Sequence, residues 1–305
     1  MSEPLTSAAA GKQRFGHVAL LGRPNVGKST LLNALIGEHL AIVTHKPQTT
    51  RHRIVGLLTE ARGQVAFVDT PGMHRRRDHA LNRRLNRIAA DTGKGVDLAV
   101  MVVDATRFTE EDELVLDLVG KHEGPSILAF NKIDLLKDRG VLLQKTAELS
   151  TRGNFDAVVY LSASRREGLD ELLDEVFKHL PEGGSQYPED LFTDRSERFL
   201  AAEMVREQLM LQLHQEIPYG LTVVVERFER QDRRLEIDAL ILVAEERHKA
   251  MVIGRQGQVL KRVGTRARHA IADLLGQPVH LSLHVKTRSG WIDDDRELDE
   301  LGYAR

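Results

Sequence analysis

The residues best suited to chemistry stand near the start of the chain, in a short glycine-rich segment. It reads Gly22-Arg-Pro-Asn-Val-Gly27-Lys28-Ser29 and fits the spacing G-x-x-x-x-G-K-S. An apolar run precedes it, and the helix-like run TLLNALIG follows it. In such a strand–loop–helix, glycines let the backbone wrap around phosphates, and loop N–H groups present partial positive charge. We predict a phosphate cradle in which Lys28 reaches the β- and γ-phosphates and Ser29 binds Mg²⁺.

Two further segments could complete a site for the metal ion and the γ-phosphate. Asp69-Thr-Pro-Gly72 follows the apolar run VAFV, so Asp69 can hold the Mg²⁺ shell and the Gly72 N–H can meet the γ-phosphate. Thr49-Thr50 lies between the glycine-rich loop and the next apolar run. A threonine there can close over the γ-phosphate and bind Mg²⁺. We choose Thr50 and keep Thr49 as the alternative, because sequence does not separate adjacent hydroxyls.

A further motif, Asn131-Lys-Ile-Asp134, indicates the base. The Asp134 carboxylate can accept two hydrogen bonds from guanine, from N1–H and from the 2-amino group. Adenine has neither donor and would leave the carboxylate unpaired, which gives strong discrimination. Asn131 can hold neighbouring loops, and the stem of Lys132 can cover the ring. Ser162-Ala163 ends another apolar run and can present a backbone N–H to guanine O6.

These motifs need a scaffold that brings the ends of several strands together. Apolar runs alternate with helix-like stretches through the first 180 residues, which predicts an open, mostly parallel sheet covered on both faces. The second and third runs are close enough to form an antiparallel hairpin at its edge. The runs interpreted as strands are His17–Leu21, Ile54–Leu58, Val65–Val68, Leu98–Val103, Ile127–Phe130 and Val158–Leu161. The helices include Thr30–Leu35, Ala80–Ala90 and Leu169–Leu180.

The pattern changes after Pro181–Asp190, a segment rich in proline, glycine and polar residues that is typical of a linker. Beyond it, Ser196–Leu213 has a helical pattern, and three β-like stretches follow: Leu221–Glu229, Arg234–Ala244 and the alternation from Val279 to Val285. We predict an α/β fold, with a P-loop domain containing a mixed, mostly parallel sheet and then a smaller α+β domain. The predicted bounds are 1–14 for a disordered lead without signal-peptide character, 15–181, 182–195 for the linker, and 196–305 with a C-terminal tail.

The second half contains a segment suited to nucleic acid. In Val252-Ile-Gly254-Arg255-Gln256-Gly257, two glycines between helical stretches allow a sharp turn and close approach of a nucleic-acid backbone. A helix is predicted from Gln258 to about Leu275. Residues 247–288 hold nine Lys or Arg and one acid, whereas 293–300 hold six acids and one Arg. This pattern favours a polyanion-binding surface. The expected RNA contacts are Gly254, Arg255, Gln256, Gly257, Lys261, Arg262 and Arg266.

Four segments resemble the corresponding motifs of the Era family of GTPases: GRPNVGKSTLLNALIG, KPQTTRHRIVG, DTPGMH and NKID. VIGRQG, with the order helix, two strands, paired helices, strand, resembles a KH domain of the second type. The resemblance runs from about residue 15 to the end. It implies a GTP-hydrolysing switch with GTP/GDP and Mg²⁺ that binds the 3′ end of 16S rRNA and assists assembly of the small ribosomal subunit. It also implies loose membrane association, which the composition does not support independently.

The resemblance also assigns roles to individual residues. It assigns Mg²⁺ to Ser29, Thr50 and Asp69, and catalysis to Lys28, Thr50 and Gly72. The nucleotide-binding residues that it implies are Gly22, Arg23, Pro24, Asn25, Val26, Gly27, Lys28, Ser29, Thr30, Thr50, Asp69, Thr70, Pro71, Gly72, Asn131, Lys132, Asp134, Ser162 and Ala163.

Three features extend or depart from the Ras-type pattern. Ras-type enzymes carry a Gln just after the DxxG glycine, but Met73 stands here and cannot orient the attacking water. Era-like proteins resemble this sequence in having an apolar residue there. Asn25 matches the P-loop Asn with which related GTPases bind K⁺, so K⁺ is a further candidate cofactor. Arg75, Arg76 and Arg77 are candidates for an intrinsic arginine finger, although a solvated charge run is the stronger interpretation.

Composition narrows the class of protein further. The 305 residues include no cysteine, which excludes disulfides, thiolate metal sites and a catalytic Cys. The longest apolar run, Leu98–Val103, is too short to cross a bilayer. We expect a cytoplasmic monomer without a transition-metal site, because the histidines show no ligand spacing. His45, His52, His74 and His79 are expected to be solvated.

Two other functions stay open from the sequence alone. One is an RNA-binding module whose nucleotide site is degenerate, against which the intact Lys28, Ser29, Asp69 and Asp134 argue. The other is a GTPase of tRNA modification, whose C-terminal cysteine chemistry this chain lacks. A tandem GTPase of the Der type is disfavoured because there is one P-loop.

Overall fold

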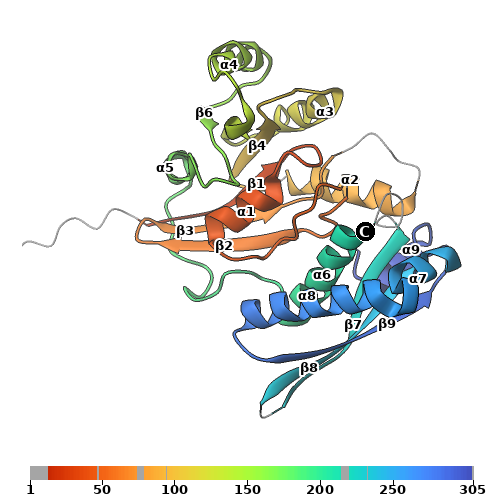
Figure 1. The fold of residues 1–305 in the computed structure, drawn as a ribbon. Helices are drawn as coiled ribbons and strands as arrows, with labels where there is room; N and C mark the ends of the chain where they lie inside the picture. Colours follow the sequence, from red (N-terminus) through yellow and green to blue (C-terminus); the bar gives the residue numbers. More distant parts are fainter. Residues whose placement is uncertain are drawn as a thin grey trace, which may run out of the picture.

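A six-stranded mixed sheet forms the scaffold of the first half of the chain (Figure 1). The computed structural model describes residues 13–46, 48–73, 79–93, 95–213, 220–231 and 233–303. The strand order is β2-β3-β1-β4-β5-β6, in which only β2 is antiparallel to its neighbour. The predicted mixed, mostly parallel sheet with an edge hairpin is therefore confirmed. The strands are β1 (Arg14–Leu21), β2 (Ile54–Glu60), β3 (Gly63–Asp69), β4 (Leu98–Asp104), β5 (Ser126–Asn131) and β6 (Ala157–Tyr160).

Helices cover both faces of this sheet, which is why its strands are near-continuous apolar runs. One core lies under α1 (Lys28–Ile36) and α5 (Leu169–His179), and the other lies under α3 (Glu110–Val119) and α4 (Val141–Arg152). Sequence periodicity did not single out α3 and α4. Helix α3 opens with four consecutive acids, and α4 buries only two residues, so neither shows a strong apolar stripe.

The second half builds a three-stranded sheet with the order β7-β8-β9. Strand β8 pairs antiparallel with β7 and parallel with β9, and α6 and α8 pack on the sheet in a separate core. The predicted order of helix, two strands, helix pair and strand is confirmed. The elements are α6 (Glu197–Gln212), β7 (Leu221–Gln231), β8 (Arg234–Val243), α7 (Glu246–Ile253), η3 (Arg255–Gly257), α8 (Gln258–Leu275) and β9 (Val279–Thr287).

The segment predicted as a linker follows the edge of the first sheet. The Gly183 N–H donates to the Gln13 carbonyl, and the Leu57 N–H of edge strand β2 donates to the Phe192 carbonyl. Its Pro- and Gly-rich composition prevents a regular element, but backbone and side-chain groups of the sheet still fix its course. Strand β1 begins at Arg14, and residues 1–12 of the predicted lead lie outside the described residues.

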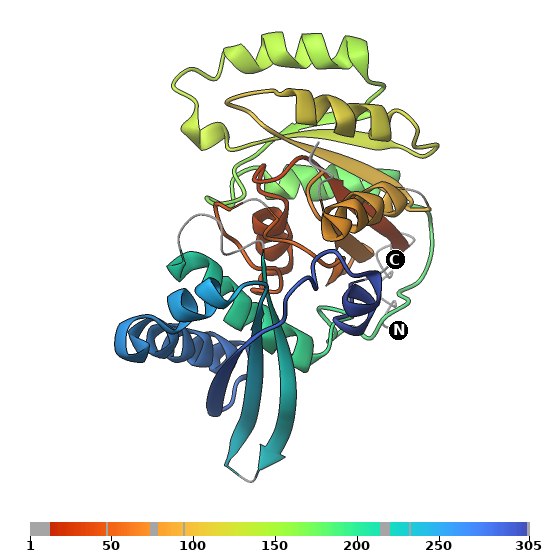
Figure 2. The same ribbon diagram turned by 90° about the vertical axis from the view of Figure 1, so that its right-hand side faces the viewer.

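The last described residues return to the first half of the chain. Helix α9 (Asp295–Glu300) lies beside α2 (Ala80–Thr92), as Figure 2 shows. Trp291 and Tyr303 are fully buried in a small core with residues of α2. The acidic tail therefore packs against the basic helix α2 as well as following the second sheet. No helix in the described ranges is long and apolar enough to cross a membrane.

Candidate nucleotide site and RNA groove

The glycine-rich loop joins β1 to α1 in the conformation that its sequence predicts. Gly27 caps α1 with φ 102°, a left-handed conformation that favours glycine. A Cβ at Gly27 would lie 2.3 Å from the Asn131 amide nitrogen, so space as well as backbone angle requires glycine. A glycine-rich loop that leads into the N-terminus of α1 in this way is suited to bind a phosphate.

Lys28 lies buried inside this loop. Its Nζ donates to the carbonyls of Gly22, at 2.9 Å, and Arg23, at 3.0 Å. Burial lowers the pKa of the Lys28 ammonium to about 8, against an opposing contribution from nearby Asp69. A buried cation whose described acceptors are neutral carbonyls is suited to gain an anionic partner such as a phosphate oxygen.

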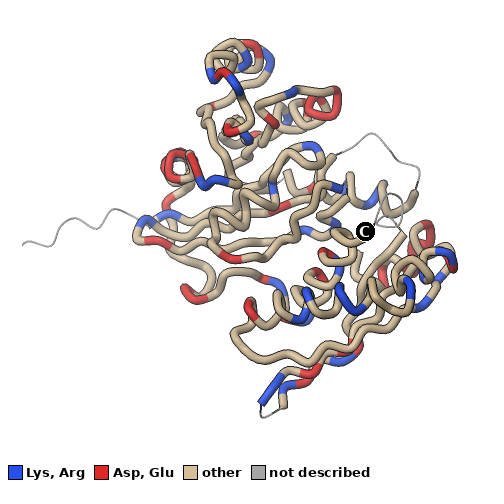
Figure 3. Tube along the Cα trace, in the orientation of Figure 1, with Lys and Arg blue, Asp and Glu red and all other residues tan. Residues whose placement is uncertain are grey.

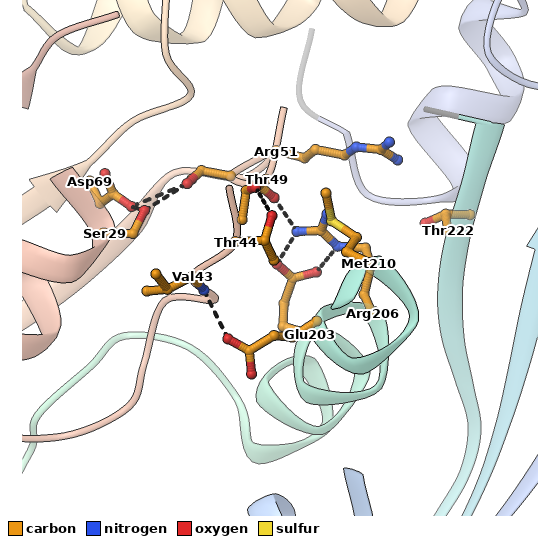
Figure 4. A network of polar contacts seen from close by, with 12 residues as sticks. Ser29, Val43, Thr44, Thr49, Arg51, Asp69, Glu203, Arg206, Met210 and Thr222 are labelled. Atoms are coloured by element: carbon orange, nitrogen blue, oxygen red, sulfur yellow. Dashed lines mark hydrogen bonds and ion pairs between the residues drawn. The ribbon is translucent and has the colours of Figure 1, made fainter. Parts of the chain in front are cut away.

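Three oxygen-bearing side chains meet at the start of α1. The Ser29 hydroxyl donates to Asp69 Oδ2 at 2.7 Å (Figure 4). It also lies 2.8 Å from the Thr50 hydroxyl. Burial raises the pKa of Asp69, and its buried Oδ1 has no hydrogen-bond partner among the described residues. Oxygen ligands around an unsatisfied carboxylate fit Mg²⁺. The Thr49 hydroxyl instead donates to the Lys46 carbonyl at 2.7 Å, so the geometry favours Thr50.

The DxxG segment passes close to the glycine-rich loop. A Cβ at Gly72 would lie 2.5 Å from the Pro24 nitrogen, which explains the glycine. The Thr70 hydroxyl donates to the Leu20 carbonyl, and Met73 packs against the core under α3 and α4. Met73 therefore serves packing. Arg75, Arg76 and Arg77, the candidates for an intrinsic finger, lie outside the described residues, as does His74.

The predicted base-binding residues come together at the ends of β5 and β6. Asn131 donates to the Val26 carbonyl at 2.8 Å, so it ties the base motif to the phosphate loop. Asp134 accepts a hydrogen bond from the Ser162 hydroxyl at 2.7 Å, which orients its carboxylate. The Ala163 N–H donates to Asn131 Oδ1 at 3.0 Å in this structure, so a contact with guanine O6 would compete with that bond.

The sequence motifs did not predict a network of ion pairs that lies beside the nucleotide site. Arg23 Nε donates to Asp112 at 2.9 Å, and Lys132 Nζ contacts Asp104 at 2.8 Å and the Asn25 carbonyl at 2.6 Å. Asp112 also completes a capping box at the start of α3. The acidic start of α3 was the only sequence signal available, because its partner Arg23 lies 89 positions earlier.

Two of the four histidines predicted to be solvated are engaged in contacts. His52 stacks on Tyr303 with ring centroids 4.7 Å apart, and its Nδ1 is buried. Desolvation by burial lowers the pKa of His52 to about 4. His79 pairs with Asp293 at 2.9 Å. The prediction was wrong for His52, because its ring is buried against Tyr303 of the distant C-terminal tail. It is confirmed for His79, since 48% of that side chain is exposed even though it pairs with the tail.

The GxxG segment forms a sharp turn between α7 and α8. Gly254 has φ 72°, and a Cβ there would lie 2.4 Å from a Val259 methyl group, so glycine is required. Gln256 also adopts a positive φ, of 51°, in the turn. A groove of about 470 Å³ begins at Gly257 and runs between α8 and edge strand β9. It is lined by Gly257, Leu260, Lys261, Gly264, Thr265, Arg268, His280, Leu281 and Leu283.

Lys and Arg positions recur along α8 (Figure 3), and two of them, Lys261 and Arg268, line the groove. Lys261 lines it, whereas the predicted contacts Arg262 and Arg266 lie one position further around the helix and are exposed. Arg268 lines the groove and was missing from the prediction. Apolar and basic walls with a glycine-bounded floor suit unpaired bases and their phosphates.

Comparisons with known proteins agree with this geometry. The sequence pattern of the 50S ribosome-binding GTPase family matches residues 17–132, and that of the KH domain matches residues 216–292. The chain is 48% identical over 291 residues to GTPase Era of Pseudomonas entomophila, an alignment that covers 95% of this chain and 97% of the relative. It is 47% identical to GTPase Era of Xanthomonas oryzae pv. oryzae, over 97% of this chain and 99% of the relative.

Two solved structures match nearly the whole fold. One is an Era variant from Aquifex aeolicus bound to GDP·AlF₄⁻, and the other is Era in complex with MgGDPNP and nucleotides 1506–1542 of 16S ribosomal RNA. Each superimposes with a TM-score of 0.92 and 34% identity, over 96% of this chain and 100% of the matched chain.

Proposed function

This chain belongs to the Era family of GTPases, and we propose that it is a GTP-hydrolysing switch that binds the 3′ end of 16S ribosomal RNA through its KH domain. The observation that carries this function is the presence of both sites in one chain. Ser29, Thr50 and Asp69 stand together at the phosphate loop, and the GxxG groove lies beside basic α8. The protein uses GTP and Mg²⁺.

The chain's own residues perform most of the work in hydrolysis. Loop N–H groups and Lys28 bind the phosphates, and the Gly72 N–H meets the γ-phosphate. Ser29, Thr50 and Asp69 hold Mg²⁺, which when bound neutralises charge on the β- and γ-phosphates. Met73 offers the attacking water no hydrogen bond. Backbone positioning and cations therefore supply the catalysis, which predicts slow intrinsic turnover.

Several finer points belong to the same proposal. The protein acts as a cytoplasmic monomer that assists assembly of the small ribosomal subunit. Peripheral association with a membrane is a family property to which no described residue lends independent support. K⁺ binds beside the phosphates at Asn25. Its positive charge stabilises the transition state in a site that has no Gln to orient the attacking water.

One experiment tests the function directly. The protein is crosslinked in cells, in wild-type form and as Lys28→Met, and the attached RNA is sequenced. GTP hydrolysis is measured on the same two proteins. We expect wild type to hydrolyse GTP and to enrich the 3′ end of 16S rRNA, and Lys28→Met to lose hydrolysis. Enrichment of tRNA would favour the tRNA-modification alternative, and RNA capture without GTP hydrolysis in wild type would favour a pure binding module.

A further inference from the structure

The segment that carries Thr50 is held from the second half of the chain. We define the switch segment as residues 39–46 and 48–53. Arg206 Nη2 on α6 donates to the Thr49 carbonyl at 2.5 Å (Figure 4). The Val43 N–H donates to Glu207 of the same helix at 2.8 Å. Lys46 donates to the Met210 and Leu213 carbonyls at the end of α6. Four residues in the C-terminal half of α6 and its cap, from Arg206 to Leu213, thus hydrogen-bond to the switch segment.

Among these contacts Arg206 is the buried charged group that reaches the Thr49 carbonyl, and 1% of its surface is exposed. Its Nε and Nη2 bind the two Glu203 oxygens at 2.7 Å and 2.6 Å, one helical turn away. Burial works to raise the pKa of Glu203, but Arg206 outweighs it and holds that pKa below its usual value. The planar guanidinium is therefore fixed by a bidentate pair, and Nη2 points at Thr49 without further freedom.

The peptide that Arg206 holds leads straight to the metal-binding side chains. The Thr49 carbonyl and the Thr50 nitrogen belong to one planar peptide unit, so fixing the carbonyl fixes the plane from which Thr50 starts. Beyond that plane, the Thr50 hydroxyl lies 2.8 Å from Ser29 Oγ and 3.4 Å from Asp69 Oδ2. Only one peptide separates the arginine contact from the Mg²⁺-binding group.

A second arginine holds the other side of Thr50. Arg51 is fully buried, and its Nη1 donates to the Leu221 carbonyl at the start of β7 at 2.7 Å. The Tyr303 hydroxyl lies 3.4 Å from the same nitrogen. The residues before and after Thr50 are therefore both anchored to elements beyond residue 196, whereas the Thr50 side chain faces the P-loop.

We propose that Arg206 is a positioning residue that acts through the Thr49 carbonyl to place Thr50 at the Mg²⁺ and γ-phosphate site. The inference rests on the proposed function. In GTPases, a switch segment is ordered by its contacts with the γ-phosphate and Mg²⁺, and it is released when the γ-phosphate leaves. Docking of α6 therefore favours GTP over GDP, and by reciprocity GTP favours docking of α6.

The test separates the two nucleotides. Affinities for a non-hydrolysable GTP analogue and for GDP are measured at several Mg²⁺ concentrations for wild type, Arg206→Met and Arg206→Lys. We expect both variants to bind the GTP analogue about tenfold more weakly and to need more Mg²⁺, with GDP affinity within about twofold of wild type. Lysine keeps a charge opposite Glu203 but cannot supply the fork that reaches two partners.

Controls separate positioning from folding. Arg198→Met removes an arginine from the same helix whose contact, the Val225 carbonyl at 3.4 Å, lies within the second half, and it should leave both affinities unchanged. The double variant Glu203→Gln with Arg206→Met avoids an unpaired buried carboxylate and should reproduce the selective loss. Thermal melting of each variant reports its folding.

Three outcomes overturn the inference. Unchanged affinity for the GTP analogue in the folded double variant does so, and so does an equal loss for GDP. A wild-type chain that binds neither nucleotide overturns the proposed function itself, and this inference falls with it. The first two outcomes leave the function standing, so the two failures are distinguishable.

Discussion

At the scale of single residues, the base motif offers the most direct test. Asp134 has a side chain 9% exposed and is oriented by the Ser162 hydroxyl. We expect Asp134→Asn to weaken GTP binding by at least about a hundredfold, because two hydrogen bonds to a charged acceptor are lost. Titration of labelled GTP measures the change, and an unchanged dissociation constant would remove Asp134 from the site.

A change of base provides the control for that substitution. Xanthine carries a carbonyl where guanine has its 2-amino group, so the Asn amide can donate to it. The variant should therefore bind XTP better than wild type does, which a merely unfolded protein could not do. Asp138→Asn, a nearby exposed carboxylate that accepts a bond from the Gly140 N–H, should alter neither affinity.

Asn25 carries the potassium hypothesis. Its amide donates to the His45 carbonyl at 2.9 Å, so it also ties the P-loop to the switch segment. Hydrolysis should be faster in K⁺ than in Na⁺, because a fixed cation stabilises charge that develops at the β–γ bridge. Asn25→Ala should lose the difference, whereas Asn25→Asp, which keeps a side-chain oxygen, should retain part of it. Equal wild-type rates at matched ionic strength would contradict the hypothesis.

At the scale of elements, the contact between the switch segment and α6 should depend on pH. His39 Nε2 lies 3.1 Å from both Glu207 oxygens, and the hydrogen bond to Glu207 is the main reason that the pKa of His39 is raised above its usual value of 6.5. A raised folded-state pKa adds stability that is complete below about pH 6.5 and is lost as pH rises through the folded value.

Thermal melting from about pH 5.5 to about pH 9 checks this dependence. The melting temperature of wild type should exceed that of His39→Gln at the acidic end and converge with it at the alkaline end. The gap should be small, because 46% of the His39 side chain faces water. His284→Gln, an exposed position on β9, should show no such convergence. A gap that grows with pH would have the wrong sign.

The GxxG turn and its groove form the second element that can be tested alone. Replacing Arg255 and Gln256 with Asp places two carboxylates where Gly254 and Gly257 admit the RNA backbone, so repulsion should abolish tight RNA binding. GTP binding should persist. A matched control carries the same charge change on β7, as Arg227→Asp with Gln231→Asp, at the sheet edge opposite β9.

Binding series at several salt concentrations would measure the effect. Wild-type affinity for a single-stranded 3′-terminal rRNA fragment should fall with salt, because neutralised phosphates release counterions. A duplex should bind less well, since the groove suits unpaired bases. Equal binding of the fragment by the Arg255/Gln256 variant and wild type would refute the KH assignment of the groove.

At the scale of the whole molecule, the C-terminal tail joins the two halves. Arg84 of α2 is 5% exposed and binds Asp295 at 2.6 Å, Asp299 at 2.7 Å and the Tyr303 carbonyl at 2.8 Å. Arg84→Met should lower the free energy of unfolding by about 2 kcal/mol, because several hydrogen bonds to a charged donor disappear and their acceptors lose a partner.

Urea unfolding measures that loss, and hydrogen exchange over residues 292–303 localises it. Arg87→Met removes an exposed arginine from the same helix and should cost far less. If both variants unfold at the same urea concentration and exchange stays slow in the tail, the tail is held by Trp291 and Tyr303 rather than by Arg84.

Much of this architecture follows from the sequence alone. The glycine-rich loop, DxxG and NKxD segments predicted their own local structure, because each depends on neighbours within a few positions and on the strand that precedes it. The alternating apolar residues of β8 and the stripe on α8 likewise predicted the second fold. Family resemblance then assigned the chemistry of these segments.

Only the tertiary structure decided the contacts between distant residues. Thr49 and Thr50 have identical side chains, and what separates them is that Ser29 and Asp69 lie on one side and Arg206, 157 positions from Thr49, on the other. The packing of the acidic tail against α2 likewise depends on Arg84 and carboxylates that lie more than 200 positions from it in the sequence. Local periodicity reports which face of an element is apolar, but not which buried arginine will find which carbonyl.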